Sequence, residues 1–203
     1  MHALNARYRE TLRNTDGSTP DIATFVPMDG YHLTRAQLSA MPDPDTAHAR
    51  RGAAFTFDSA GFLELLLALR ARISSDAPAI TAPSFDHAAK DPVASAISVP
   101  ISCRIVVLEG LYLALNEGDW AKARECMDLV WFVEVDEATA RRRLVKRHVA
   151  AGIAKDEDDA GQRADANDLP NGREIIAKRG KVDEIVISRE DAEWRVEGTE
   201  ERS

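Results

Sequence analysis

An apolar run that ends in an acid constrains the fold of this chain more than any other feature. Residues Ile22 to Met28 favour a β-strand, and Asp29-Gly30 follows them directly. Open α/β folds place their ligands at the carboxyl ends of the strands, so this strand would carry Asp29 to such an edge. The same pattern fits a plain strand followed by a turn, because Asp-Gly is a common turn dipeptide. This run alone leaves both interpretations open.

The rest of the sequence alternates predicted strands with predicted helices. Further strands are expected at 79–82, 104–108, 129–135 and 184–187, and helices at 3–13, 34–38, 59–74, 119–126, 137–151, before 167 and at 172–179. Asp58 and Asp136 are expected to cap the helices at 59–74 and 137–151. The prolines place 41–46 and 83–92 in loops, and the acidic stretch 156–159 is expected to be mobile. The runs 104–108 and 129–135 are typical of strands buried on both faces. Together these predictions indicate an α/β protein with a parallel sheet and crossover helices.

Composition narrows the class of protein without naming a function. At 203 residues we expect one domain with a sizeable core. A formal net charge of −8 argues against a general nucleic-acid binder, which neutralises phosphates with a basic surface. Cys103 and Cys126 form neither a disulfide framework nor a metal spacing, and no apolar run is long enough to cross a membrane. These features favour a soluble cytoplasmic protein, and they leave its oligomeric state open.

Two acids and one basic helix are the strongest candidates for chemistry. Asp29 and Glu109 each follow an apolar strand, and such carboxylates can accept a proton from a hydroxyl or help to hold Mg²⁺. Either acid could instead cap a turn. Arg143 and Arg147 lie one helical turn apart in a basic helix, where guanidinium groups suit phosphate oxygens. That helix face could equally be an ordinary solvated surface.

Two loops could return to the same sheet edge. Arg51 could bind an anionic or polyhydroxyl substrate, Phe85 could stack on a ring, and His87 could donate a hydrogen bond. Both stretches also fit ordinary surface loops with one aromatic residue turned inward. Neither loop decides the function alone.

Taken together, these stretches resemble the P-loop kinases of the uridine kinase, pantothenate kinase and phosphoribulokinase superfamily, in its nucleoside/nucleotide kinase-like branch. The resemblance rests on a set of motifs in a specific order: Pro27-Met28-Asp29-Gly30-Tyr31-His32-Leu33, residues 50–58, residues 83–92, Val107-Leu108-Glu109-Gly110-Leu111-Tyr112-Leu113, Arg147-His148 and residues 167–172. It covers the chain from about residue 24 to 194. It implies a P-loop NTPase-like parallel sheet with flanking helices and a helical lid at 137–172.

The resemblance also implies roles for the candidate residues. The implied activity is ATP-dependent phosphorylation of a hydroxyl on a small metabolite such as a nucleoside, a pantothenate-like compound or a sugar. Asp29 would be the catalytic base and Glu109 the acid associated with Mg²⁺. The remaining site residues fall into an acceptor group and a nucleotide group: Tyr31, His32, Arg51, Phe85 and His87 around the acceptor, Arg143 and Arg147 on the phosphates, and Asn167 and Asp168 near the nucleotide base.

One departure from the family pattern affects the whole interpretation. The phosphate-binding loop, Gly-x-x-x-x-Gly-Lys-[Ser/Thr], should precede the Asp29 strand, yet the residues before Asp29 contain one glycine and no lysine. Loss of a central strand would leave an apolar slot with unpaired backbone groups. We therefore expect a kinase-like domain with an N-terminal truncation, in which 1–20 is a remnant helix and loop and 197–203 a disordered tail. The alternatives are a non-catalytic binding protein that keeps the acceptor pocket and, with less support, an α/β hydrolase-like protein.

Overall fold

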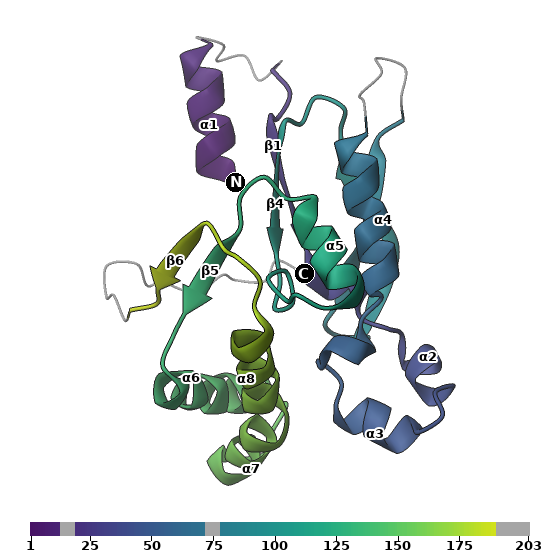
Figure 1. The fold of residues 1–203 in the computed structure, drawn as a ribbon, viewed down its shortest axis with the longest axis vertical. Coiled ribbons are helices and arrows are strands. Elements are labelled where there is room, and N and C mark those ends of the chain that lie inside the picture. Colours follow the sequence, from purple (N-terminus) through teal and green to yellow (C-terminus); the bar gives the residue numbers. More distant parts are fainter. Residues whose placement is uncertain (13–18, 72–77, 190–203) are drawn as a thin grey trace.

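The computed structural model describes residues 1–12, 19–71 and 78–189. It is an α/β structure whose helices lie around several short strands (Figure 1). The strands are β1 (Ala23–Pro27), β2 (Ile80–Asp86), β3 (Asp91–Val99), β4 (Ile105–Glu109), β5 (Trp131–Glu134) and β6 (Glu184–Ile187). The helices are α1 (His2–Thr11), α2 (Arg35–Ser39), α3 (Pro44–Ala49), α4 (Ser59–Arg70), α5 (Gly118–Glu125), α6 (Glu137–Ala150), α7 (Glu157–Arg163) and α8 (Leu169–Lys178), with 3₁₀ turns η1 (Met28–Tyr31) and η2 (Ala54–Thr56) and the π-helical turn η3 (Ala164–Asp168).

The described strands form three separate pairs. β1 and β4 are parallel, with Ala23 opposite Ile105 and Pro27 opposite Glu109. β5 and β6 are also parallel, whereas β2 and β3 form an antiparallel hairpin. The expected parallel pairing with helical crossovers is therefore confirmed. In Figure 1 the β5–β6 pair stands apart from the β1–β4 pair, so the parallel sheet is divided into two halves.

The main hydrophobic core lies under α4 and α5. Phe62 and Leu66 of α4 pack with Trp120 of α5 and with Tyr112, which follows β4. Trp120 meets the Phe62 and Tyr112 rings in tilted arrangements at centroid distances of 5.6 and 5.9 Å, a favourable range for aromatic pairs. This core fixes the carboxyl ends of β1 and β4, the edge at which the candidate acids are found.

Strands β4, β5 and β6 are much more exposed than their sequences indicate. We expected 104–108 and 129–135 to be buried on both faces, but Trp131 and Val133 are 67 % and 63 % exposed. Ile105 and Val107 of β4 are also exposed, as are the apolar residues of β6. The expectation of full burial is wrong because no described strand lies between β4 and β5 to cover them.

Several local expectations are corrected. Residues 41–46 are not all loop, since Pro44 begins α3 and Asp43 caps it; proline is tolerated in the first turn, where no N–H partner is needed. Residues 83–92 belong largely to the β2–β3 hairpin, whose open edges accommodate Pro83 and Pro92.

The acidic stretch 156–159 is also different from our expectation. It begins helix α7, because the Asp156 side chain caps the helix and acids are favourable in a first turn. The helix expected at 59–74 is seen to Arg70, and Ile73 lies outside the described residues, as does the tail 197–203. The predicted caps Asp58 and Asp136 are confirmed, each accepting a backbone N–H of its helix.

Candidate functional site

The two strand-terminal acids lie side by side at the carboxyl edge of the β1–β4 pair. Glu109 is the last residue of β4 and pairs with Pro27, and Asp29 follows two residues later in η1. Partial burial raises the pKa of the Glu109 carboxyl, and the nearby negative charge of Asp29 adds to the effect. Neither acid forms an ion pair with a described residue. The expected convergence of both carboxylates at one edge is therefore present.

Two glycines allow the backbone around these acids to pack unusually closely. A Cβ on Gly30 would lie 2.2 Å from the carbonyl oxygen of Pro83, which belongs to β2. A Cβ on Gly110 would lie 2.3 Å from the Cβ of Met28, the residue before Asp29. Both distances are shorter than any real contact, so each position requires glycine. Close backbone packing thus holds the turn after β1 against both β2 and the end of β4.

His32 joins the acids to a group of aromatic side chains. Its Nδ1 lies 2.9 Å from the carbonyl oxygen of Asp29, and its ring lies 4.0 Å from Phe57 and 4.9 Å from Phe85 between centroids. Burial lowers the pKa of His32, and the positive charge of Arg51 lowers it further, against the raising effect of Asp29. The lowered pKa favours the neutral form of His32, which presents a polar ring next to Asp29.

Arg51 lies in this region but already has partners. Its Nη2 is 3.0 Å from Asp91 Oδ1 and 3.0 Å from the carbonyl oxygen of Leu33, and its guanidinium lies 5.7 Å from the Phe85 ring. His87 contacts Phe85 edge-on at 5.3 Å. The structure therefore brings His32, Arg51, Phe85 and His87 together, with Arg51 neutralised by an acid of its own.

Tyr31 differs from the other predicted acceptor residues because it belongs to the core. Its ring meets Phe62 edge-on at 5.1 Å, and burial, followed by the charge of Asp58, raises the pKa of its hydroxyl to about 12. We find its side chain packed under the site rather than beside the acids.

Asn167 ties the helical region to the loop that carries Arg51. Its side-chain oxygen accepts a hydrogen bond from Arg50 Nε at 3.1 Å, and its amide nitrogen donates to the carbonyl oxygen of Arg51 at 3.0 Å. Asn171, also buried, accepts from Arg50 Nη2 at 2.9 Å. No sequence pattern singles out Arg50 or Asn171 as a site residue; the one signal for them is that both lie within stretches that carry the family resemblance.

The neighbouring Asp168 belongs to a second contact of the same helices. One of its carboxylate oxygens lies 3.6 Å from Nε2 of the buried His148 of α6. The side chains of Asn167 and Asp168, predicted to lie near the nucleotide base, thus both have protein neighbours.

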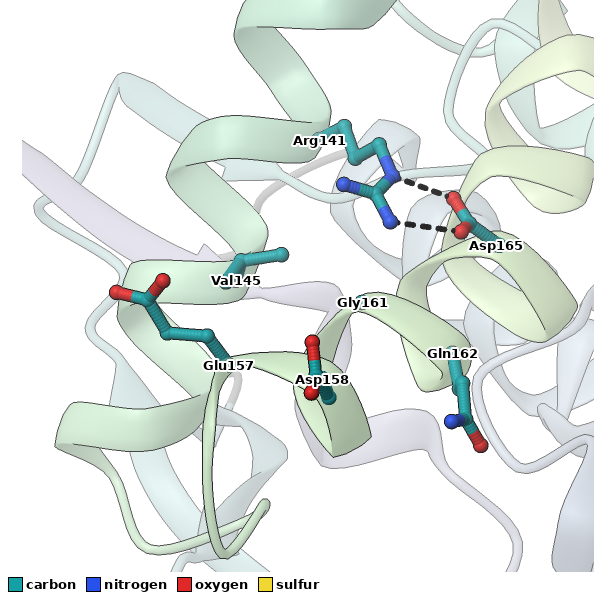
Figure 2. Close-up of a pocket in the computed structure, with 7 residues that line it drawn as sticks. All are labelled: Arg141, Val145, Glu157, Asp158, Gly161, Gln162 and Asp165. Atoms are coloured by element: carbon teal, nitrogen blue, oxygen red, sulfur yellow. Dashed lines mark hydrogen bonds and ion pairs between the residues drawn. The ribbon is translucent and has the colours of Figure 1, made fainter.

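The basic helix α6 places its arginines in different surroundings. Arg143 donates to Ser188 Oγ at 2.7 Å, while Arg147 is exposed and makes no hydrogen bond or ion pair with a described residue. Arg141 forms two hydrogen bonds to Asp165, at 2.7 and 2.8 Å, beside an open cavity of about 400 Å³ between α6 and α7 (Figure 2). Within the described ranges, no hydrogen bond or ion pair joins Arg143 or Arg147 to Asp29 or Glu109.

Either acid has the chemistry to help hold a magnesium ion. Mg²⁺ prefers oxygen ligands and keeps several waters, so one or two protein carboxylates and the phosphates of a substrate are enough to hold it. Asp29 and Glu109 provide such oxygens without a competing cation among the described residues. The described part of the chain contains no group of three or more metal-binding side chains, which a dedicated protein cage would need.

Solved structures with the same architecture define the class of protein. The crystal structure of YFH7 from Saccharomyces cerevisiae, assigned as a P-loop containing kinase with a circular permutation, matches with a TM-score of 0.74 at 36 % identity over 84 % of this chain. A protein from Silicibacter sp. TM1040, assigned as a fructose transport system kinase, matches with a TM-score of 0.70 at 32 % identity and covers 91 % of this chain and 82 % of its own. The fold is therefore that of a P-loop kinase.

Sequence comparison then gives the family. The ATP-dependent kinase-like protein notR' of Aspergillus versicolor is 52 % identical over 159 residues, which are 78 % of this chain and 92 % of that protein. The ATP-dependent kinase YFH7 of Kluyveromyces lactis is 38 % identical over 80 % of this chain. The chain belongs to this family of ATP-dependent kinase-like proteins.

The relatives differ in how much of their length is matched. The chain spans 56 % of the K. lactis YFH7 and 59 % of the solved S. cerevisiae YFH7 chain, but 92 % of notR'. No family model matches the sequence. Among the described residues, no helix has both the length and the apolar character needed to cross a membrane.

Proposed function

We propose that this chain carries the acceptor-binding and base-bearing part of a kinase that phosphorylates a hydroxyl group of a small metabolite. The observation that carries the proposal is the placement of Asp29 and Glu109 at adjacent ends of parallel strands, with His32 and Phe85 beside them. Membership of an ATP-dependent kinase-like family supports the phosphoryl donor. The activity of the whole protein is also part of this proposal, because YFH7 is much longer than the part that this chain matches.

Each acid has a separate task in the proposed reaction. Asp29 takes the proton from the acceptor hydroxyl as its oxygen forms a bond to the γ-phosphorus of ATP. The bond between that phosphorus and the bridging oxygen of ADP breaks, and ADP leaves with the electron pair. Glu109 would hold Mg²⁺, which would supply positive charge to offset that of the phosphate oxygens. His32, held by the Asp29 carbonyl oxygen, orients the acceptor.

The charges around Asp29 favour an uncharged acceptor. Arg51, the cation nearest the aromatic group, is already paired with Asp91, whereas Asp29 and Glu109 have no such partner among the described residues. An anionic acceptor would therefore meet net negative charge. Phe85 and His32 offer ring faces for stacking. Nucleosides and sugars fit these surroundings better than phosphosugars or pantothenate-like carboxylates, and the fructose named for the Silicibacter relative is of this uncharged kind.

A non-catalytic binding role is the second candidate, and one observation favours it. The 203 residues contain no Gly-x-x-x-x-Gly-Lys-[Ser/Thr] stretch, the loop that cradles the phosphates of ATP in this class of kinase. Phosphoryl transfer depends on that positioning. We therefore propose that these residues alone transfer phosphate weakly or not at all, and that full activity requires a phosphate-binding loop from elsewhere.

Calorimetry with ATP and Mg²⁺ is the first test. The 203-residue chain should show no micromolar binding, and a chain extended with an apolar strand and a phosphate-binding loop should bind ATP and phosphorylate nucleosides or sugars. In the extended chain Asp29→Asn should lower transfer by roughly 10²- to 10⁴-fold with unchanged ATP affinity. Asp45→Asn, on the exposed helix α3, serves as the matched control. Normal turnover by Asp29→Asn would refute the base assignment, and an extended chain that binds ATP without transfer would favour the non-catalytic role.

A further inference from the structure

Two neighbouring arginines on the loop after α3 bind different parts of the molecule. Arg50 donates through Nε to Asn167 Oδ1 at 3.1 Å and through Nη2 to Asn171 Oδ1 at 2.9 Å. Arg51 binds the β2–β3 hairpin instead. Their loop, residues 50–52, is called the arginine loop below. It joins η3 and α8 on one side to the hairpin on the other.

The helical side of this connection is buried. Asn167 and Asn171 are four residues apart and are 4 % and 2 % exposed. The amide nitrogen of Asn167 also donates to the carbonyl oxygen of Arg51 at 3.0 Å, so both ends of this side chain bind the arginine loop. Asn167 lies in the π-helical turn η3, a rare geometry that occurs frequently at functional sites. These two buried amides therefore serve the loop, although Asn167 was expected near the nucleotide base.

The backbone of the arginine loop is itself fixed. Gly52 has a φ of +105°, in the region that favours glycine. Its N–H donates to Thr56 Oγ1 at 2.9 Å, and its carbonyl oxygen accepts from the hydroxyl of the buried Tyr112 at 2.8 Å. Because the turn has so little freedom, a displacement of Arg50 has to move the adjacent Arg51 as well.

The other side of the arginine loop borders the aromatic group beside Asp29. Arg51 Nη1 donates to the carbonyl oxygen of Lys90 at 2.6 Å, and the guanidinium carbon of Arg51 lies 5.7 Å from the centroid of the Phe85 ring. Phe85 in turn lies 4.9 Å from His32 between ring centroids. The position of Arg51 therefore sets one boundary of the group that we assign to the acceptor.

We propose that Arg50 is a positioning residue that couples η3 and α8 to the acceptor group. While Asn167 and Asn171 hold Arg50, the arginine loop holds Arg51 against the hairpin and the Phe85 ring. A ligand that fixes η3 and α8 in this position should then strengthen acceptor binding, and by linkage the acceptor should strengthen binding of that ligand equally. The role of the acceptor group rests on the proposed function, whereas the coupling itself is a property of the chain alone.

Nuclear magnetic resonance on the 203-residue chain, without ATP or an acceptor, tests the coupling. Asn171→Ala removes one oxygen that accepts from Arg50. Among the described residues, Asn171 makes no hydrogen bond or ring contact with Phe85 or His32, so an effect on them has to pass through the arginine loop. We expect the ring signals of both residues to shift and amide exchange at 51–53 to become about tenfold faster.

A conservative variant separates positioning from a general loss of stability. Asn171→Asp keeps an oxygen that can accept from Arg50, so the ring signals of Phe85 and His32 should return to their parent positions. A second substitution, Arg50→Met, approaches the contact from the loop and should reproduce the shifts of Asn171→Ala. It keeps an unbranched apolar stem without the donors, and it provides the test if Asn171→Ala does not fold.

Arg173→Ala is the matched control. Arg173 is an arginine of α8 that makes two hydrogen bonds to Glu137, at 2.6 and 2.7 Å, and none to the arginine loop. Its loss should leave loop exchange and the Phe85 signals unchanged. Unchanged Phe85 and His32 signals in folded Asn171→Ala or Arg50→Met, or equal shifts in Arg173→Ala, would overturn the coupling. If the shifts occur but phosphate transfer is absent from the extended chain, the proposed function fails and the coupling stands.

Discussion

The two parallel strand pairs of this protein are alike in sequence and opposite in environment. β1 and β6 are both short and rich in Ile, Val, Ala or Phe, yet Val26 of β1 is fully buried while all four residues of β6 are exposed. The difference comes from what surrounds them, because β1 and β4 contribute Val26, Val106 and Leu108 to the core beneath α4 and α5, whereas the β5–β6 pair contacts it through Phe132. The apolar pattern of a strand therefore shows which residues are suited to burial, and the neighbouring elements determine whether those residues are buried.

The core and the β5–β6 pair should differ most in how much free energy of unfolding is lost when an aromatic side chain is removed. Phe62→Ala, at a position that is 0 % exposed, should lower the free energy of unfolding by about 3–5 kcal/mol, because it leaves a cavity in the core. Trp131→Ala, at 67 % exposure, should cost less than about 1 kcal/mol. Urea denaturation measures both values. Equal losses of unfolding free energy would show that β5 is buried in solution and would contradict the difference in environment between the two strand pairs.

The close backbone contacts should give the next largest effect. Gly30→Ala would force a Cβ against the Pro83 carbonyl oxygen and should destabilise the protein by about 1–3 kcal/mol. Gly172→Ala in α8 is the control, since no atom lies within 4 Å of its Cβ position, and it should stabilise the helix by up to about 1 kcal/mol. Thermal melts distinguish the two. A tolerated Gly30→Ala would mean that β2 moves away from η1 at little cost.

The smallest expected effect is on the pH dependence of stability, to which two acids should contribute with opposite signs. The pKa of Glu109 is raised in the folded protein above its ordinary value of 4.5. The contribution of this carboxyl to folding stability is therefore present below pH 4.5 and is lost as the pH rises through the pKa of the folded state. Glu109→Gln should therefore be more stable than the parent at neutral pH and similar to it in acid. Hydrogen bonds from Thr139 lower the pKa of Asp136, so its contribution is present above 3.8 and lost as the pH falls. Asp136→Asn should accordingly lose stability at neutral pH.

Denaturation midpoints measured across the acid range test both signs. Glu109 ends β4 and Asp136 caps helix α6, so the two titrations report on different halves. The same sign for both variants would contradict the environments described for these acids.

Much of the fold follows from the sequence, because its signals are local. Asp58 and Asp136 cap their helices as predicted, and the strand 184–187 agrees with its expected bounds. The β3 strand was missed because its exposed small and polar residues have no clear alternation, and its pairing with β2 is a tertiary contact. The exposure of β5 was missed for a related reason, since burial depends on a neighbour that the strand sequence does not contain.

The site could be predicted only in part. Asp29 and Glu109 follow apolar strands, and parallel pairing brings such residues together, so sequence order was sufficient. The pairing of Arg51 with Asp91, and of Arg50 with Asn167, joins residues far apart in the chain. No local pattern contains that information. The roles of Arg143, Arg147 and Asp168 in binding ATP stay predictions.

The glycine contacts around η1 have a consequence for how such proteins diversify. Because Gly30 meets the main chain of β2 and Gly110 meets the side chain of Met28, the position of the acids depends on the close approach of the main chain at these two glycines. The loop that carries Arg51 can then be exchanged during evolution while the frame that holds the carboxylates is inherited unchanged. One chemical apparatus can in this way be passed among lineages that act on different metabolites.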